Sequence, residues 1–291
     1  MELISQIPIA LWIAGVLALY MAWAIGANDV ANAMGTSVGS GALTVWGAIL
    51  VAAIFEFAGA FFAGGHVTDT VRKGMLDISL IGRDQLIYGM LGSLAAAGTL
   101  LVGATRFGLP VSTTHSIVGA IVGFGVVSIG PEVVNWGKIG QIVLSWLTSP
   151  LLAGVIAFGI FQFTRAKVLD TKDPVAQIRK LGPVFFFLVF FIIGLVTLFK
   201  GLKPLKLDLN LTQALIGSTL LGFIGSGLGI FFIRRVQLGQ EDPKDRFSRV
   251  EKIFVVLQIL TACAIAFAHG SNDVANAIGP LAAVSGAISG A

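Results

Sequence analysis

Two nearly identical polar motifs interrupt long apolar stretches near the two ends of the chain. The first is Gly26–Ala33, with the sequence GANDVANA, and the second is Gly270–Ala277, with the sequence GSNDVANA. Each motif contains one aspartate and two asparagines. Polar groups are costly in apolar surroundings, because no water is available to solvate them. Because both motifs contain these unfavourable residues, the motifs indicate a functional site.

The side chains of these motifs offer the oxygen ligands that hard cations prefer. In both motifs a glycine comes shortly before an Asn-Asp pair. Glycine tolerates an unwound turn, and Asn and Asp compete for backbone hydrogen bonds, so the sequence predicts a local break in each helix. Broken helices of this kind bind ions in membrane transporters. We expect a cation site, with hydrogen bonding between helices as the alternative. The expected ligands are Asn28, Asp29, Asn272 and Asp273, with sodium on the two aspartates.

Glu56 lies in the middle of the second apolar stretch, between Phe55 and Phe57. A carboxylate inside a membrane is unfavourable unless it is paired, protonated or in contact with water, so it indicates a functional site. Glu56 could bind a cation or carry a proton. The alternative is that it is a buried structural partner of a polar group on another span.

The run Gly108–His115, with the sequence GLPVSTTH, is a second concentration of polar groups. Pro110 suits the first turn of a helix. Ser112, Thr113 and Thr114 then place hydroxyls and unpaired N–H groups at the helix start, where oxyanions bind. Three consecutive hydroxyl residues suit a tetrahedral anion such as phosphate. The alternative is an ordinary helix cap.

Two histidines adjoin these polar runs. His115 could equally be a ligand or a structural polar residue. His269 has the better functional case, because it directly precedes the second motif.

The composition indicates an all-α integral membrane protein. The chain is 56% hydrophobic and 12% charged, and a soluble domain carries about twice that charged fraction. Cys263 is the single cysteine, which excludes a disulfide within the chain and a multi-cysteine metal site. The pI of 9.4 does not indicate nucleic acid, because the charges lie in short loops between apolar stretches. The sequence contains no ATP-binding loop motif and no evident pairing of a nucleophile with a base, so we expect neither an ATP-driven pump nor an enzyme.

A helical span needs about 20 apolar residues, and eight stretches qualify. The fourth is short and could be a re-entrant hairpin instead of a crossing. The expected spans are 4–27, 41–65, 84–105, 111–130, 136–163, 181–199, 209–233 and 253–278.

The distribution of Lys and Arg among the loops favours an N-terminus outside the cell. With eight spans, the two motif-bearing spans run in opposite directions. That is typical of inverted-topology repeats in secondary transporters. We expect a first repeat over 1–163, connecting spans and loops over 164–252, and the start of a truncated second repeat over 253–291. A chain with this ending is expected to be a fragment of a longer protein, with completion of the half-repeat by another subunit as the alternative.

The two motifs, Glu56 in its setting, Val71–Gly74 and Pro110–His115 resemble sequences of the inorganic phosphate transporter (PiT) family of sodium- or proton-coupled symporters. The resemblance covers about residues 15–125 and 253–291. It implies an inverted-repeat symporter in which both motifs serve the coupling cation and the phosphate, with Asn32 and Asn276 on the phosphate. It implies importance for Glu56, Ser112 and His269 as well.

The sequence therefore predicts symport of inorganic phosphate with a cation by alternating access. Sodium is favoured because the motifs offer oxygens, and Glu56 keeps a proton open. The alternatives are a transporter or channel for another tetrahedral oxyanion such as sulfate, and a membrane receptor that transports nothing. The expected setting is the lipid bilayer of the plasma membrane, crossed several times. No cofactor is expected, and a homodimer is left open.

Overall fold

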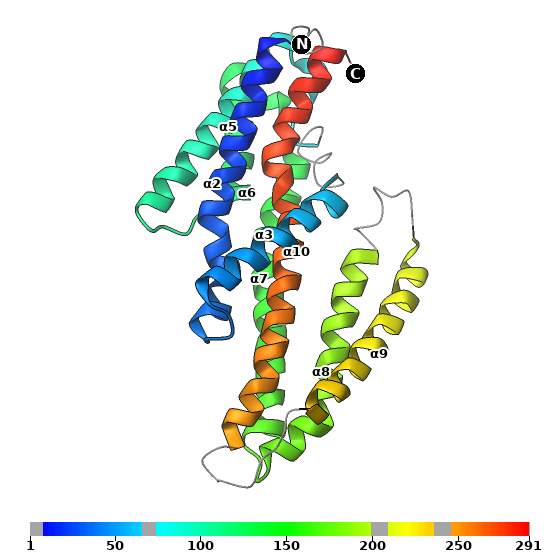
Figure 1. Ribbon diagram of the computed structural model, residues 1–291. Coiled ribbons are helices and arrows are strands. Elements are labelled where there is room, and N and C mark those ends of the chain that lie inside the picture. The colour runs from blue at the N-terminus through cyan, green and yellow to red at the C-terminus, as the bar shows by residue number, and fades with distance from the viewer. Residues whose placement is uncertain (1–7, 66–73, 199–208, 236–245, 291) are drawn as a thin grey trace, which may run out of the picture. The chain divides into compact units, whose positions relative to one another are not determined.

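The computed structural model describes residues 8–65, 74–198, 209–235 and 246–290 of the chain (Figure 1). Residues Val71, Arg72 and Lys73 of the family resemblance lie outside this part. Nearly all described residues are helical. The long helices are α2 (Ile9–Gly39), α3 (Val45–Ala63), α5 (Arg83–Arg106), α6 (Thr113–Ser128), α7 (Trp136–Thr164), α8 (Pro174–Val196), α9 (Leu211–Arg235) and α10 (Arg246–Ser289). Between them lie short 3-10 helices at Ile78–Leu80 and Pro131–Val133 and a π-helical segment at Arg165–Leu169.

Within the described residues, seven helices are long and apolar enough to cross a bilayer. This confirms the expected all-α membrane fold. The expected fourth span corresponds to α6, which has 16 residues. At 1.5 Å per residue it measures about 24 Å, which is shorter than a hydrocarbon core of about 30 Å.

Helices α5 and α6 form a hairpin whose two ends meet. The backbone N–H of Asp77 donates to the Val133 carbonyl at 2.8 Å, and that of Asn135 donates to the Met75 carbonyl at 2.9 Å. The chain therefore enters α5 and leaves α6 at the same place. A hairpin that returns to its starting point, by two crossings or by re-entry, ends on the side of the membrane where it began. It therefore does not alter the direction in which the next helix runs.

The described residues fall into two compact units. One comprises Met1–Thr36, Ile49–Ile142 and Ile265–Ala291, and the other comprises Ser37–Ala48 and Val143–Ala264. The first unit, called the motif unit below, contains both polar motifs, Glu56 and the α5–α6 hairpin. These two units are defined by packing, whereas the predicted boundaries at 163 and 252 are limits of sequence repeats. Those boundaries therefore stay predictions.

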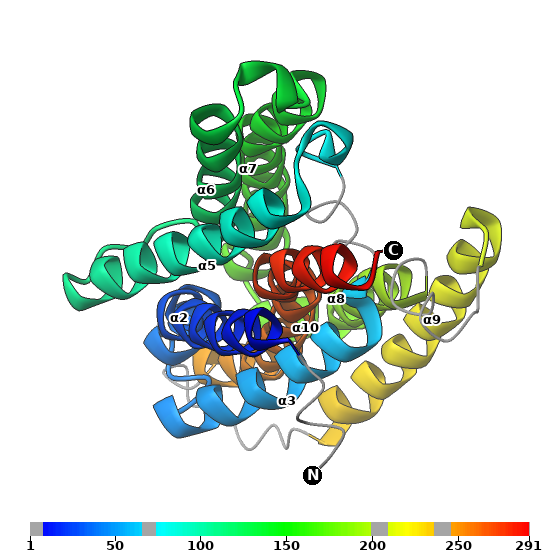
Figure 2. The ribbon, with the colours of Figure 1, turned by 90° about the horizontal axis from the view of Figure 1, so that it is seen from above.

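Outside the motif unit, α8 and α9 lie side by side as a helix pair (Figures 1 and 2). Phenylalanines of α8 cover glycines of α9. A Cβ added to Gly222 would lie 2.7 Å from the Phe187 ring, and one added to Gly229 would lie 2.6 Å from Phe186. Small residues let membrane helices approach closely. In lipid the hydrophobic effect does not drive helices together, so close van der Waals packing holds them instead. The glycine-rich run of α9 is therefore a packing surface.

The two motif-bearing helices lie side by side in the motif unit and run in opposite directions (Figures 1 and 2). Figure 1 shows the start of α2 (blue) and the end of α10 (red) at the same end of the motif unit, so the chain runs along the two helices in opposite directions. The opposite direction of the two motifs, expected from the sequence, is thus observed.

The expected break in each motif helix is wrong. Both α2 and α10 continue as α-helix through their motifs. The physical reason is that the asparagines do not compete for their own backbone: Asn28 and Asn276 donate to the α5–α6 hairpin instead. In addition, Gly270 does not unwind α10, because it is the point where α10 packs against the backbone of α3 at Glu56.

Candidate functional site

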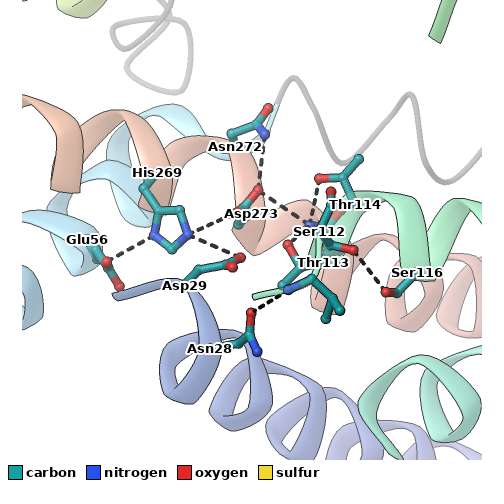
Figure 3. Close-up of polar contacts among 12 residues, drawn as sticks. Asn28, Asp29, Glu56, Ser112, Thr113, Thr114, Ser116, His269, Asn272 and Asp273 are labelled. Carbon is teal, nitrogen blue, oxygen red and sulfur yellow. Dashed lines mark hydrogen bonds and ion pairs between the residues drawn. The ribbon is translucent and has the colours of Figure 1, made fainter. Parts of the chain in front are cut away.

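Three carboxylates surround the imidazole of His269 (Figure 3). Its Nδ1 lies 2.9 Å from Glu56 Oε1. Its Nε2 lies 2.7 Å from Asp273 Oδ2 and 3.6 Å from Asp29 Oδ2. The four side chains come from α2, α3 and α10, and each is at most 20% exposed.

The close contact of α3 with α10 brings Glu56 to His269. Gly59 on α3 faces the Phe267 carbonyl of α10, and Gly270 on α10 faces the Glu56 carbonyl of α3. A Cβ at either glycine would overlap these backbone atoms. The two glycines therefore permit a backbone-to-backbone contact beside the histidine.

The charge of this cluster is unbalanced. Three carboxylates carry three negative charges, and a histidine can offset one at most. Ligand atoms of Asp29, His269 and Asp273 all lie within 4.8 Å of one another, close enough to share one metal ion. The Nε2 atom of the imidazole faces both carboxylates that the sequence assigned to sodium, Asp29 and Asp273. The cluster thus suits a bound cation or a proton on the ring.

Asp273 links this cluster to the α5–α6 hairpin. Its Oδ2 faces His269, while its Oδ1 accepts hydrogen bonds from Asn272 at 3.0 Å and from Asn276 at 3.4 Å. The Asn276 amide also donates to the hydroxyls of Thr113 at 3.3 Å and Thr114 at 3.2 Å. Asp273 therefore joins the His269 cluster, through Asn276, to the hydroxyls at the start of α6.

The start of α6 has the geometry of a capped helix N-terminus. Ser112 is the N-cap, and its hydroxyl accepts a hydrogen bond from the His115 N–H at 3.2 Å. Pro110 lies before the cap, so the expectation that it occupies the first helical turn is wrong. The N–H groups of Thr113 and Thr114 stand in the first turn, where a helix has no acceptor for them. They remain available to an oxyanion.

Asn28 fastens the tip of the hairpin to α2. Its amide nitrogen donates to Thr105 Oγ1 at 2.9 Å and to the Leu109 carbonyl at 3.3 Å. Its amide oxygen accepts from the Val111 N–H at 3.4 Å. The sequence assigned Asn28 to the cation, but all its contacts within the described residues are to the hairpin.

A cavity of about 220 Å³ opens onto the carboxylate side of the site. Glu56, His269 and Asp273 are its titratable lining residues, and Gly26 and Gly270 are among the others. Space for an ion or water therefore exists beside the carboxylates, between α2, α3 and α10.

The structure brings together most residues that the sequence singled out, namely Asn28, Asp29, Glu56, Ser112, Thr113, Thr114, His269, Asn272, Asp273 and Asn276. Asn32 is exposed and has no hydrogen bond to a described residue. His115 is exposed on α6. Thr105 was not among the residues that the sequence singled out. Its one signal in the sequence is a hydroxyl at the end of an apolar stretch, shortly before Ser112.

Comparison with known proteins identifies relatives over nearly the whole chain. A model of the phosphate transporter family matches residues 25–289. The chain is 48% identical over 287 residues to a putative phosphate permease of Haemophilus influenzae, covering 98% of this chain and 68% of the relative. It is 42% identical to the chloroplastic inorganic phosphate transporter 2-1 of Arabidopsis thaliana, covering 91% of this chain and 48% of the relative.

A solved structure described as the sodium-dependent phosphate transporter is also similar. It matches with a TM-score of 0.88 and 41% sequence identity over 97% of this chain and 68% of its own. This chain thus spans about two thirds of the length of most of these relatives. The family consists of membrane transporters and not enzymes, as the sequence predicted. The chain belongs to the phosphate transporter family.

Proposed function

We propose that this protein carries inorganic phosphate across a membrane together with sodium. The observation that carries the proposal is the position of Asp273, which contacts the carboxylate cluster through His269 and the start of α6 through Asn276. The proposed cation site and the proposed anion site would therefore be adjacent. The similar solved structure, described as the sodium-dependent phosphate transporter, supports both ligands.

Electrostatics explains why the two ligands would move together. Two like unit charges about 5 Å apart repel by about 3 kcal/mol at an effective dielectric constant of about 20. Phosphate at the α6 start would meet this repulsion from Asp273 unless a cation neutralises the carboxylate. Sodium at Asp29 and Asp273 would remove the repulsion, so phosphate would bind well only with sodium present.

Alternating access between two inverted repeats is the proposed transport cycle. The antiparallel motif helices support it. So does the burial pattern: Asn28 and Asn276 are buried on the hairpin, while Asn272 and Asn32, at the corresponding positions of the opposite motif, are exposed. One residue from each motif copy therefore contacts the same hairpin, as expected for a site formed where two repeats meet.

Proton coupling is the second candidate, and the position of His269 favours it. An imidazole among three carboxylates can take up a proton on one side of the membrane and release it on the other. In that case the ring, and not sodium, supplies the positive charge beside Asp29 and Asp273.

Uptake of radiolabelled phosphate into proteoliposomes tests these proposals, with a sodium gradient and a pH gradient imposed separately. We expect the sodium gradient to drive uptake and excess unlabelled sulfate to leave it unchanged. Asp29→Asn and Asp273→Asn should each lower uptake at least about tenfold, since one charge-assisted contact contributes about 1.5–3 kcal/mol. Asp84→Asn, an exposed control on α5, should transport normally.

The other outcomes separate the candidates. Uptake driven by the pH gradient alone would replace sodium with the proton. Competition by sulfate would show a general oxyanion transporter. Normal uptake by both aspartate variants would remove the carboxylate cluster from the mechanism.

A further inference from the structure

The tip of the α5–α6 hairpin, residues 105–112, has little apolar anchorage of its own. Phe107 is 80% exposed and Leu109 is 55% exposed. Within the tip, the Leu109 N–H donates to the Ala104 carbonyl at 2.9 Å, which closes the turn after α5. That bond fixes the tip to α5 but not to the rest of the site.

Among the described residues, the hydrogen bonds that join the tip to α2 all come from the Asn28 side chain. Asn28 is 7% exposed and uses both ends of its amide: the nitrogen donates to Thr105 and Leu109, and the oxygen accepts from Val111. Val111 directly precedes Ser112, the N-cap of α6. The same motif places Asp29 one residue after Asn28. The position of the hairpin tip and the position of the Asp29 carboxylate are therefore set by adjacent residues of one helix.

We propose that Asn28 and Thr105 are positioning residues that hold the phosphate-binding helix start in register with the cation site. The Asn28 amide spans the tip from its first residue, Thr105, to the residue before the cap. Loss of either partner releases the tip from α2 and leaves the hydroxyls of Thr113 and Thr114 less well placed. This inference rests on the proposed transport of phosphate.

This role differs from that of a direct cation ligand. If Asn28 only bound the cation, substitution of Thr105 would not change phosphate binding, because Thr105 makes no hydrogen bond to the carboxylates. If Asn28 positions the tip, removing the Thr105 hydroxyl alone weakens phosphate binding. Thr105 is therefore the residue that separates the two roles.

The kinetic test compares Thr105→Val, which deletes the hydroxyl at similar volume, with Thr105→Ser, which keeps it. Thr99→Val is the matched control, since Thr99 is an exposed threonine on the same helix. We expect Thr105→Val to raise the KM for phosphate about five- to tenfold, as loss of one neutral hydrogen bond predicts. The maximal rate should change less than the KM. Thr105→Ser and Thr99→Val should resemble the unmodified protein.

Two kinetic results would overturn the proposal. One is an unchanged KM in Thr105→Val. The other is an equal fall in activity for Thr105→Val and Thr105→Ser, which would show that the hydroxyl is not the cause.

Hydrogen exchange of the purified chain tests the same contact without transport. In Asn28→Ala the Val111 N–H loses its acceptor, so peptides covering residues 107–112 should exchange at least about tenfold faster. Asn32→Ala, the other asparagine of the motif, should leave this exchange unchanged. Unchanged exchange in Asn28→Ala overturns the positioning role. If exchange is faster in Asn28→Ala but the unmodified chain transports no phosphate, the proposed function is refuted and the Asn28 contact stands.

Discussion

His269 concentrates the chemistry of this protein at the residue scale. Its ring meets Glu56 on one side and Asp29 and Asp273 on the other. In the sequence Asp29, Glu56 and the His269–Asp273 pair belong to three different apolar stretches. Together they make a site with more negative than positive charge, which attracts a cation or a proton and must be neutralised before an anion can bind nearby.

Glu56→Gln tests this cluster, because it keeps the shape of the side chain and removes its charge. We expect phosphate uptake to fall about 10- to 100-fold, since a hydrogen bond to a charged group contributes about 1.5–3 kcal/mol and each 1.4 kcal/mol corresponds to about tenfold. Glu132→Gln, at an exposed carboxylate outside the site, is the control. Normal uptake by Glu56→Gln would make Glu56 a structural partner only.

At the scale of elements, the contact between α3 and α10 decides whether the cluster can form. Gly270 and Gly26 occupy the same position in the two motifs, but their surroundings differ. A Cβ at Gly270 would overlap the backbone of Glu56, whereas a Cβ at Gly26 would meet no described atom within 4 Å. The two copies of one motif residue therefore have different packing roles.

Matched alanine substitutions should reveal this difference. We expect Gly270→Ala to lower stability by about 1–3 kcal/mol, the usual cost of overpacking. Gly26→Ala should be neutral or slightly stabilising, since alanine is favoured over glycine in a helix by up to about 1 kcal/mol. Thermal unfolding of both variants in detergent, followed by circular dichroism, measures the difference. Equal melting temperatures would show that α3 and α10 are not in backbone contact.

At the scale of the whole molecule, a symporter must bind its two ligands with linked affinities. Such a coupling is typically about 1–3 kcal/mol and must be reciprocal. We expect phosphate to bind at least about tenfold more tightly in sodium chloride than in choline chloride of equal ionic strength. Sodium should bind more tightly with phosphate by the same factor. Calorimetric titration measures both affinities, and equal phosphate affinity in the two salts would contradict sodium coupling.

Much of this protein could be predicted from local patterns. Long apolar stretches predicted all-α membrane spans, because a helix is the structure that satisfies its own backbone in lipid. The seven long apolar helices of the described residues agree with that prediction. The polar residues of the motifs, Glu56, His269 and the Ser112–Thr114 start could be singled out because each is costly in an apolar setting. The shortness of α6 could also be expected, because the apolar stretch that forms it is short.

Other features depended on contacts that the sequence does not record. By itself, the sequence determined which residues are too polar for their surroundings and which stretches cross or enter the membrane. Only the tertiary structure decided that the motif helices continue unbroken, that Asn28 and Asn276 hold the hairpin, and that Gly270 packs while Gly26 does not. The physical reason is that a side chain's hydrogen bonds go to whichever acceptors the packing brings near, and those acceptors lie on helices distant in the sequence.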